Sequence, residues 1–265
     1  MQEVTKRVVS GACIAPLILC ILLFLPAWLL GLFLVLVICV AAYEVLTISA
    51  TRHKLVAGLL AVSSAIPLYL HSLPAYALWV LLSPMAYLAF RMAEPGEGAD
   101  GVNEEIAKAV AGLVCTQVFI VLALFYVFRL KELNPYYPAI IVLAVWATDT
   151  AAYFIGRKFG KKRLAPSISP RKTWAGLLGA MGGGAVLISV FGSVLQMDIW
   201  ECVLVGALIG LFGQLGDILE SVFKRVCGVK DSSALIPGHG GMLDRIDSFL
   251  FTAPFAYHYL AGFSS

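Results

Sequence analysis

The sequence predicts an all-α, polytopic integral membrane protein. The mean hydropathy of the 265-residue chain is +0.90, and 60% of its residues are hydrophobic whereas only 13% are charged. Its apolar runs are long enough to cross a hydrocarbon core of about 30 Å, which takes about 20 helical residues. These runs lack the alternating pattern of transmembrane β-strands, so a barrel is disfavoured. We predict about nine spans, at roughly residues 8–25, 28–50, 55–71, 74–92, 107–128, 136–156, 174–195, 199–222 and 247–263.

The distribution of Lys and Arg predicts the orientation of these spans. With nine spans and an inside amino terminus, only Arg129 and Lys131 of the 19 basic residues fall outside. Basic residues concentrate in the cytoplasmic segments of membrane proteins, so we expect a cytoplasmic amino terminus and an external carboxyl terminus. The chain is therefore expected in the cell (inner) membrane, with its charged loops facing the cytoplasm. Such a basic face suits anionic headgroups or nucleotides, and no nucleic-acid partner is expected.

The first four spans, within residues 1–106, contain few residues that could take part in catalysis or binding. The apolar run from Val8 continues almost unbroken to Ala50, which is not typical of a cleaved signal peptide. Glu44 is the only acidic residue of these spans that lies away from a span end. We expect it to be a hydrogen-bonded helix partner rather than a catalyst. The Gly-rich, acidic segment 94–108 is predicted to be a cytoplasmic loop that leads into a helix.

The second half, residues 107–265, contains five predicted spans and the cytoplasmic loops 157–173 and 224–246, and it holds most of the polar residues. In the sixth span, Asp149, Tyr153 and Gly156 are spaced i, i+4 and i+7, so they share one helix face. A carboxylate at this depth is expected to face a polar cavity rather than lipid. We predict that Asp149 and Tyr153 bind substrate, and that the basic residues 161–163 mainly anchor the loop at the membrane.

A candidate anion-binding segment precedes the seventh span. It contains Ser169, Arg171, Lys172 and Thr173, and Pro170 fixes the geometry of the loop. Hydroxyl groups, backbone amides and the dipole of a helix amino terminus all favour a bound phosphate. A plain helix cap is the alternative interpretation of the same residues.

The eighth span places small residues and a carboxylate in one line. Gly206, Gly210, Gly213 and Asp217 fall at i, i+4, i+7 and i+11 of the predicted helix. Small residues allow close contact between helices, either within one chain or between the two chains of a homodimer. The helix then brings further polar side chains to its cytoplasmic end: Glu220, Ser221 and Lys224.

The stretch 221–247 concentrates charge next to nearly pure hydrocarbon. A nucleoside triphosphate and a lipid phosphate repel each other, so a site for both needs cations. Magnesium held by carboxylates can bridge phosphate oxygens, while Lys and Arg screen the remaining charge. Oxygen ligands favour magnesium, or manganese, over zinc, and a second cation is compatible with this pattern. The predicted metal ligands are Asp217, Asp244 and Asp247.

His239 lies at a predicted turn beside Gly240 and Gly241, where the backbone can approach a ligand closely. Its role is open between a hydrogen-bond donor to phosphate, a general base and a purely structural side chain. The six cysteines show no paired spacing, so neither a disulfide framework nor a zinc site is predicted.

At these residues the chain resembles the phosphatidate cytidylyltransferase, or CDP-diacylglycerol synthase, family. The family signature runs Ser-x-apolar-Lys-Arg, then Lys-Asp, a small residue, and apolar-Pro-x-His-Gly-Gly-apolar-x-Asp-Arg-apolar-Asp. The upstream residues also resemble the family, although Ala175 stands where the family often has a glutamate, so no carboxylate role is assigned there. Every specified position of the signature is met: Ser221, Phe223, Lys224, Arg225, Lys230, Asp231, Ser233, Ile236, Pro237, His239, Gly240, Gly241, Met242, Asp244, Arg245, Ile246 and Asp247.

The resemblance implies a nucleotidyltransferase of phospholipid biosynthesis, in which CTP and phosphatidic acid give CDP-diacylglycerol and pyrophosphate. It implies that Asp217 and Asp244 hold magnesium, with Asp247 as a second carboxylate that ligates or orients. The lipid phosphate is already ionised at neutral pH, which lowers the expectation of a catalytic His239. The implied catalytic residues are Lys224, Arg225, Lys230, Asp231, His239, Asp244, Arg245 and Asp247. The implied substrate-binding residues are Asp149, Tyr153, Ser169, Arg171, Lys172, Thr173, Ser221, Gly240 and Gly241.

Two other functions fit some of the same features. A CTP-dependent lipid kinase of the polyprenol or phytol type would also join CTP, magnesium and a membrane lipid, but it would release CDP and a lipid phosphate. A transporter or channel would need its charged residues near the membrane midplane, whereas these concentrate at one face. The sequence therefore favours the nucleotidyltransferase.

Overall fold

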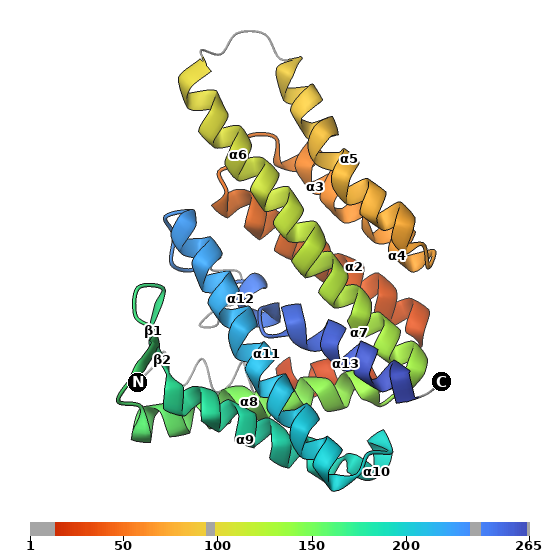
Figure 1. Cartoon of the computed structure of the whole chain (residues 1–265). Helices are drawn as coiled ribbons and strands as arrows, with labels where there is room; N and C mark the ends of the chain where they lie inside the picture. The colour runs from red at the N-terminus through yellow and green to blue at the C-terminus, as the bar shows by residue number, and fades with distance from the viewer. Residues whose placement is uncertain (1–13, 94–98, 234–239, 264–265) are drawn as a thin grey trace.

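The computed structural model of this chain is an assembly of helices with one small β-hairpin (Figure 1). It describes residues 14–93, 99–233 and 240–263. The prediction of helical spans is confirmed, but the all-α prediction missed two antiparallel strands, β1 (Arg163–Ala165) and β2 (Ser169–Thr173). They lie in the predicted loop 157–173. Both strands are short and largely open to solvent, so they lack the apolar alternation by which a strand is recognised in a sequence.

Helix α2 (Ala27–Ile48) is the central element of the first half. An apolar helix over Ile14–Phe24 precedes it, and the chain breaks at Pro26, whose missing N–H is tolerated at a helix start. Three helices follow, α3 (Lys54–Ser63), α4 (Ala65–Tyr69) and α5 (Leu73–Met92). α2 contacts α3 and, further along the chain, α7. Its buried face therefore joins the first half of the chain to the second.

Residues 104–133 form one continuous helical segment. It consists of α6 (Ala99–Cys115), the π-helical segment η1 (Thr116–Val121) and α7 (Leu122–Leu133). The predicted loop 94–108 is therefore wrong in its second part, because α6 already begins at Ala99. An i,i+4 ion pair of 2.6 Å between Glu104 and Lys108 supports helix formation there.

The second half places the hairpin at one end of the bundle (Figure 1). α8 (Tyr137–Phe159) leads into β1 and β2, and α9 (Trp174–Val190) runs back, followed by the short α10 (Gly192–Leu195). α11 (Ile199–Val226) then returns to the hairpin, so the predicted loop 224–246 begins inside its last turn. A single-turn helix, α12 (Leu243–Ile246), and α13 (Phe249–Phe263) complete the described chain.

Small residues bring α9 and α11 into backbone contact. A Cβ on Gly206 would lie 2.3 Å from the carbonyl oxygen of Gly184, and one on Gly210 would lie 2.5 Å from the backbone of Ala180. The predicted small-residue stripe is thus confirmed for these two glycines, whereas Gly213 faces α13 at ordinary distances. These two glycines contact another helix of the same chain, and homodimer formation stays a prediction.

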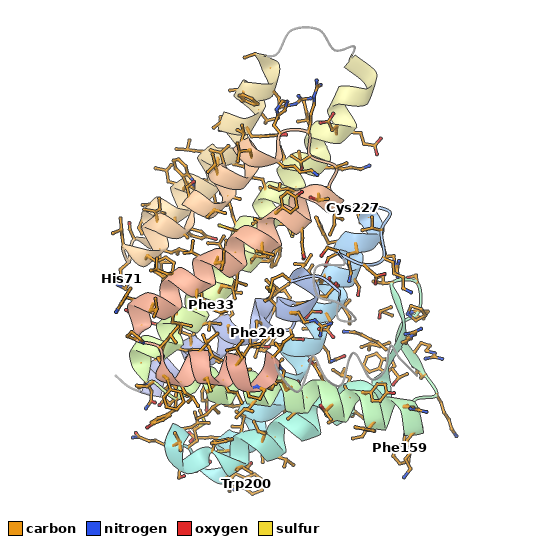
Figure 2. All side chains as sticks on the ribbon, turned by 180° about the vertical axis from the view of Figure 1, so that it is seen from behind. Phe33, His71, Phe159, Trp200, Cys227 and Phe249 are labelled. Carbon is orange, nitrogen blue, oxygen red and sulfur yellow. The ribbon has the colours of Figure 1, made fainter. Side chains whose placement is uncertain are left out.

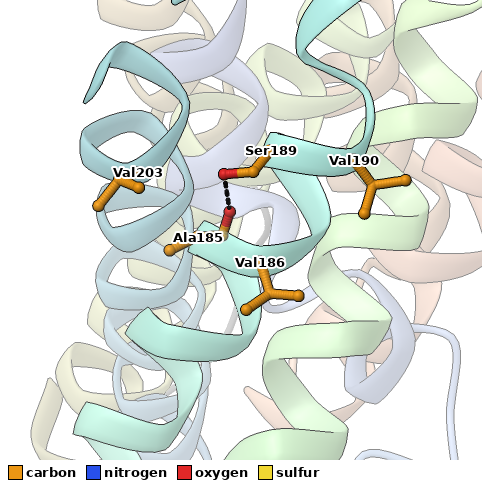
Figure 3. Close-up of a pocket in the computed structure, with 5 residues that line it drawn as sticks. All are labelled: Ala185, Val186, Ser189, Val190 and Val203. Atoms are coloured by element: carbon orange, nitrogen blue, oxygen red, sulfur yellow. Dashed lines mark hydrogen bonds between the residues drawn. The ribbon is translucent and has the colours of Figure 1, made fainter. Parts of the chain in front are cut away.

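A shallow groove beside this contact is apolar (Figure 3). Its volume is about 400 Å³, and its lining consists of Ala185, Val186, Ser189, Val190 and Val203. The Ser189 hydroxyl donates to the carbonyl oxygen of Ala185 at 2.7 Å, so its polarity is satisfied within α9. The lining of the groove includes no charged side chain, so the groove does not suit a phosphate group.

Five helices among the described residues are long and apolar enough to cross a membrane. They are α2, α5, the continuous helix 104–133, α8 and α11. Helices also occupy the other predicted span ranges, but those over Ile14–Phe24, Lys54–Tyr69 and Trp174–Val190 are shorter. The structure bears out a helical membrane protein, whereas the count of nine spans stays a prediction.

Arg129 lies at the end of the bundle opposite the hairpin. Its guanidinium contacts the ring of His71 and donates to the Tyr257 hydroxyl at 2.9 Å. Figure 2 shows His71 on the side of the molecule away from Phe159 and Cys227, which mark the ends of α8 and α11. This basic residue is therefore separated from the charged residues around the hairpin, as the charge distribution predicts.

Lys131 has a structural role near the same end. Its side chain is buried, and Nζ donates to the carbonyl oxygens of Leu22 and Leu23 at 2.5 and 3.0 Å. These carbonyls lie at the end of the first helix, where they have no partner in a following turn because of the break at Pro26. Lys131 therefore caps that helix.

Candidate active site

A polar cavity, here the first cavity, lies between the end of α8, the hairpin and α11. Its volume is about 470 Å³, and Asp149, Tyr153 and Gly156 all line it, which confirms that they share one face of α8. The Arg157 guanidinium donates to the Tyr153 hydroxyl at 3.1 Å. The lining therefore combines carboxylates with cations, and its other charged or hydroxyl residues are Arg163, Arg171, Lys172, Thr173 and Asp217.

Thr173 is the helix cap that the sequence left as an alternative. Its hydroxyl oxygen accepts a hydrogen bond from the Gly176 amide at 3.1 Å at the start of α9. A Cβ on Gly156 would lie 3.1 Å from this oxygen, and a Cβ on Gly160 would lie 2.6 Å from it. Thr173 therefore fastens the start of α9 against α8 at the wall of the first cavity.

Lys172 connects the hairpin to α11. Its Nζ lies 2.7 Å from Asp217 Oδ2 and donates to the Gln214 carbonyl oxygen at 3.2 Å. The side chains of Lys172 and Asp217 are only 15% and 22% exposed, so solvent screens this pair less than a surface pair. On the same strand Lys172 is partly buried whereas Arg171 is exposed.

Asp217 and Asp247 meet at Ser248. The Ser248 hydroxyl donates to Asp217 Oδ1 at 2.7 Å and lies 3.5 Å from Asp247 Oδ1, which also accepts the Ser248 amide at 2.7 Å. The close approach depends on Gly216, where a Cβ would lie 2.1 Å from the Asp247 carbonyl oxygen. Two carboxylates beside one hydroxyl offer several hard oxygen donors at one point, which suits a divalent cation.

Lys224 bridges two further carboxylates. Its Nζ lies 2.7 Å from Glu220 Oε2 and 2.6 Å from Asp244 Oδ1. Asp244 Oδ2 accepts hydrogen bonds from the Ser232 hydroxyl at 2.8 Å and the Gly241 amide at 2.9 Å. Burial alone would raise the pKa of Asp244, but the hydrogen bonds with Glu220, Lys224, Gly241 and Ser232 outweigh it and hold that pKa below its ordinary value. Asp244 is therefore ionised at neutral pH.

A second cavity, of about 340 Å³, lies between the hairpin turn and the end of α11. Arg225 holds the turn in place, since its Nε donates to the Ile168 carbonyl oxygen at 3.5 Å. Arg171 lines both cavities. Cations predominate in the second cavity, so it suits an anion, and the predicted site residues that line it are Ser169, Arg171, Ser221, Lys224, Arg225, Lys230 and Asp231.

Glu44 is the site residue that the sequence analysis underrated. It is 4% exposed, and it accepts hydrogen bonds from the backbone amides of Met242 and Leu243 at 2.9 and 2.8 Å. The expectation of a hydrogen-bonded partner is right, but the partners belong to the charged segment rather than to a neighbouring helix. A lone acidic residue in an apolar run indicates that its carboxylate has a buried hydrogen-bond partner, but the sequence does not show which residue that partner is. Ser232 and Ser248 were missed outright, because no local pattern distinguishes them.

The remaining predicted residues of the signature either lie outside the described residues or do not line the two cavities. His239 lies outside the described residues. Gly240 has φ +80°, in the left-handed region that favours glycine, which agrees with the predicted turn. Arg245 is exposed on α12. In the described chain, Gly240, Gly241 and Arg245 do not line either cavity.

The carboxylates fit a divalent cation in part. Within the ranges that the structure covers, no three acidic, histidine or cysteine side chains converge on one point. Asp217 and Asp247 do converge, and the buried Oε1 of Glu220 has no hydrogen-bond partner among the described atoms. Such hard oxygen donors are the ligands that magnesium prefers. The predicted trio is therefore not gathered, since Asp244 is paired with Lys224 instead.

The fold and the site define a helical membrane protein with a charged, two-cavity site at one end of its bundle. The sequence profile of the cytidylyltransferase family matches residues 5–263, so the chain belongs to that family.

Its relatives agree with this assignment. A phosphatidate cytidylyltransferase of Bacillus subtilis is 38% identical over 213 residues, which cover 71% of this chain and 77% of the relative. One of Staphylococcus epidermidis is 35% identical over 246 residues, covering 89% and 94%. One of Synechocystis is 50% identical over 119 residues, covering 44% of this chain and 40% of the relative.

Proposed function

We propose that this protein transfers the cytidylyl group of CTP to phosphatidic acid, giving CDP-diacylglycerol and pyrophosphate. The observation that carries the proposal is the pair of cavities that share Arg171 beside the carboxylates of α11. Two anionic substrates must meet in this reaction, and each cavity offers cations to one of them. The names of the relatives support the same reaction.

The chemistry is a displacement at phosphorus. An oxygen of the lipid phosphate attacks the α-phosphorus of CTP, and a new oxygen–phosphorus bond forms. The bond from that phosphorus to the bridging oxygen of the β-phosphate breaks, and pyrophosphate leaves with the electron pair. The attacking oxygen is already ionised, so the protein contributes positioning and charge stabilisation rather than a strong base.

The basic residues would hold the two phosphate groups in place. Lys172 and Arg171 supply cations to the first cavity, where Asp149, Tyr153 and Thr173 complete the wall. In the second cavity the phosphate-binding groups are Lys224, Arg225, Lys230, Ser169 and Ser221, with Asp231 at the edge. Arg245, Gly240 and Gly241 keep the supporting roles that the family resemblance implies.

Asp217 and Asp247 are the residues that would hold a magnesium ion, with Glu220 as the nearest further oxygen donor. When bound, magnesium, or manganese in its place, would neutralise phosphate charge during the displacement. Lys172 would then exchange its contact with Asp217 for one with substrate. Asp244 would hold Lys224 in position, whereas the sequence assigned Asp244 to the metal itself.

The proposal includes the arrangement in the membrane. It has about nine spans, a cytoplasmic amino terminus and a site that faces the cytoplasm of the cell (inner) membrane. The separation of Arg129 and Lys131 from the cations around the hairpin supports this orientation. Residues 107–265 would form the catalytic region, and residues 1–106 would form an amino-terminal region that supports it.

Product analysis tests the reaction. The purified protein is incubated in detergent with magnesium, with phosphatidic acid or a polyprenol, and with CTP labelled in the α-phosphate or, separately, in the γ-phosphate. We expect the α-label in a CDP-lipid and the γ-label in pyrophosphate. Label from the γ-phosphate in the lipid, with release of CDP, would instead show a lipid kinase and overturn the proposal.

A further inference from the structure

We infer that Glu44 is a positioning residue of the active site, which fixes residues 232–233 and 241–243 and through them Asp244. The inference rests on the proposed function, because it assigns α2 a part in that reaction. α2 belongs to the half of the chain that carries no other charged residue of the site. Glu44 lies 188 and 199 positions before Ser232 and Leu243, two of its partners.

The carboxylate of Glu44 is saturated with donors from one segment. Oε1 accepts from the Ser233 hydroxyl at 2.6 Å and the Met242 amide at 2.9 Å. Oε2 accepts from the Leu243 amide at 2.8 Å and lies 3.3 Å from the Ser232 hydroxyl. Hydrogen bonds to a charged acceptor are about twice as strong as neutral ones, and a buried carboxylate would be costly without them. Glu44 thus ties residues 232–233 and residues 242–243 to α2.

The same segment is shared between Glu44 and Asp244. Of three successive amides, that of Gly241 donates to Asp244 at 2.9 Å, whereas those of Met242 and Leu243 donate to Glu44. The Ser232 hydroxyl lies within reach of both carboxylates, 2.8 Å from Asp244 and 3.3 Å from Glu44. Ser232 therefore lies between the two carboxylates and links them. The direction of the Asp244 carboxylate is therefore set by groups that Glu44 holds.

The backbone at Gly241 packs closely against Ser232 and Glu44. A Cβ on Gly241 would lie 2.0 Å from the Ser232 hydroxyl oxygen and 2.5 Å from Glu44 Oε2. Asp244 in turn holds Lys224 at 2.6 Å, and Lys224 lines the second cavity. A displacement of Glu44 therefore also displaces Lys224, which lines the second cavity. A misplacement of about 1 Å at a reacting centre can lower a rate about 100-fold.

The test compares Glu44→Gln with Glu104→Gln, which changes an exposed glutamate of α6 in the same way. A glutamine keeps the size of the side chain, but its NH₂ group cannot accept from one pair of donors. We expect kcat to fall by about 10- to 100-fold in Glu44→Gln, with KM for CTP and for phosphatidic acid within about threefold of wild type. Hydrogen exchange of the peptide covering 240–246 should be faster, while exchange in α8 and α9 stays unchanged. Glu104→Gln should match wild type in every measurement.

The outcomes separate this inference from the proposed function. If the wild type makes no CDP-lipid, the proposed function fails, and exchange at 240–246 alone decides whether Glu44 holds the segment. If the wild type is active and Glu44→Gln keeps more than half of kcat, the positioning role is overturned. It is also overturned if exchange rises throughout the protein, because Glu44 would then support the fold in general. Glu44→Asp, which keeps the charge on a shorter side chain, should recover part of the lost kcat.

Discussion

Lys172 of β2 and Asp217 of α11 form a part-buried ion pair of 2.7 Å, although 45 positions separate them in the sequence. This contact brings the hairpin, which carries cations, to the helix that carries carboxylates. Each partner neutralises the charge of the other. The pair therefore keeps both charges inside the protein without leaving either one unpaired.

Removing the charge of Lys172 should impair the reaction more than the fold. Lys172→Met keeps the length of the side chain, but it takes one cation from the first cavity. Loss of one oriented, charge-stabilising group costs about 100-fold or more in rate, and we expect kcat/KM for CTP to fall by about that factor. Steady-state assays on purified protein measure it. Lys161→Met, at an exposed position near the hairpin, is the matched control, and a Lys172→Met enzyme within threefold of wild type would contradict the role.

The three aspartates should respond differently to magnesium. Asp217→Asn and Asp247→Asn remove charge where two carboxylates converge, so the magnesium concentration for half-maximal activity should rise about tenfold or more. Asp244→Asn should lose turnover at every magnesium concentration while the protein stays folded and inserted, because Lys224 is displaced. Magnesium titrations of the three variants measure this. If magnesium rescues Asp244→Asn as well as the other two, Asp244 is a metal ligand and the assignment made from its pairing with Lys224 is wrong.

Backbone contact between α9 and α11 should make Gly206 intolerant of any side chain. The methyl group of Gly206→Ala would meet the Gly184 carbonyl oxygen at 2.3 Å, whereas that of Gly182→Ala would meet nothing within 4 Å. Overpacking of this kind costs about 1–3 kcal/mol. Thermal unfolding in detergent should show a lower midpoint for Gly206→Ala and an unchanged or higher one for Gly182→Ala. Equal midpoints would mean that the two helices separate easily.

Lys131 should matter for stability and not for catalysis. Lys131→Met leaves the carbonyl oxygens of Leu22 and Leu23 without their donor, and hydrogen bonds from a charged group contribute about 1.5–3 kcal/mol each. We expect a loss of about 3 kcal/mol or more in the free energy of unfolding, measured by denaturant titration in micelles. The kcat of the folded fraction should stay at the wild-type value. Lys108→Met, at a partly exposed helical position, should change neither quantity by a comparable amount.

The sequence predicted the parts of the site that depend on helical spacing. Asp149, Tyr153 and Gly156 share a wall of one cavity because the i, i+4, i+7 rule holds along any regular helix. Gly206 and Gly210 face α9 for the same reason. The charge distribution likewise separated Arg129 and Lys131 from the basic residues that line the second cavity.

Contacts between distant segments could not be predicted in this way. Whether Asp244 would meet Asp217 or Lys224 depends on how a single-turn helix packs against α11, and spacing along the chain says nothing about that. Glu44 is the clearest case, because its partners lie nearly 200 positions away in the second half of the chain. The hairpin was not predicted because backbone pairing holds its two short strands together. Their residues show no alternation of apolar and polar side chains.

Arg171 lines both cavities, and it therefore couples binding in one cavity to binding in the other. One guanidinium cannot orient fully toward two anions at once, so occupation of either cavity changes the field in the other. Linkage requires the effect to be equal in both directions: the factor by which CTP alters the affinity for lipid phosphate is the factor by which lipid phosphate alters the affinity for CTP. The hairpin is thus a thermodynamic connection between an aqueous substrate and a membrane one.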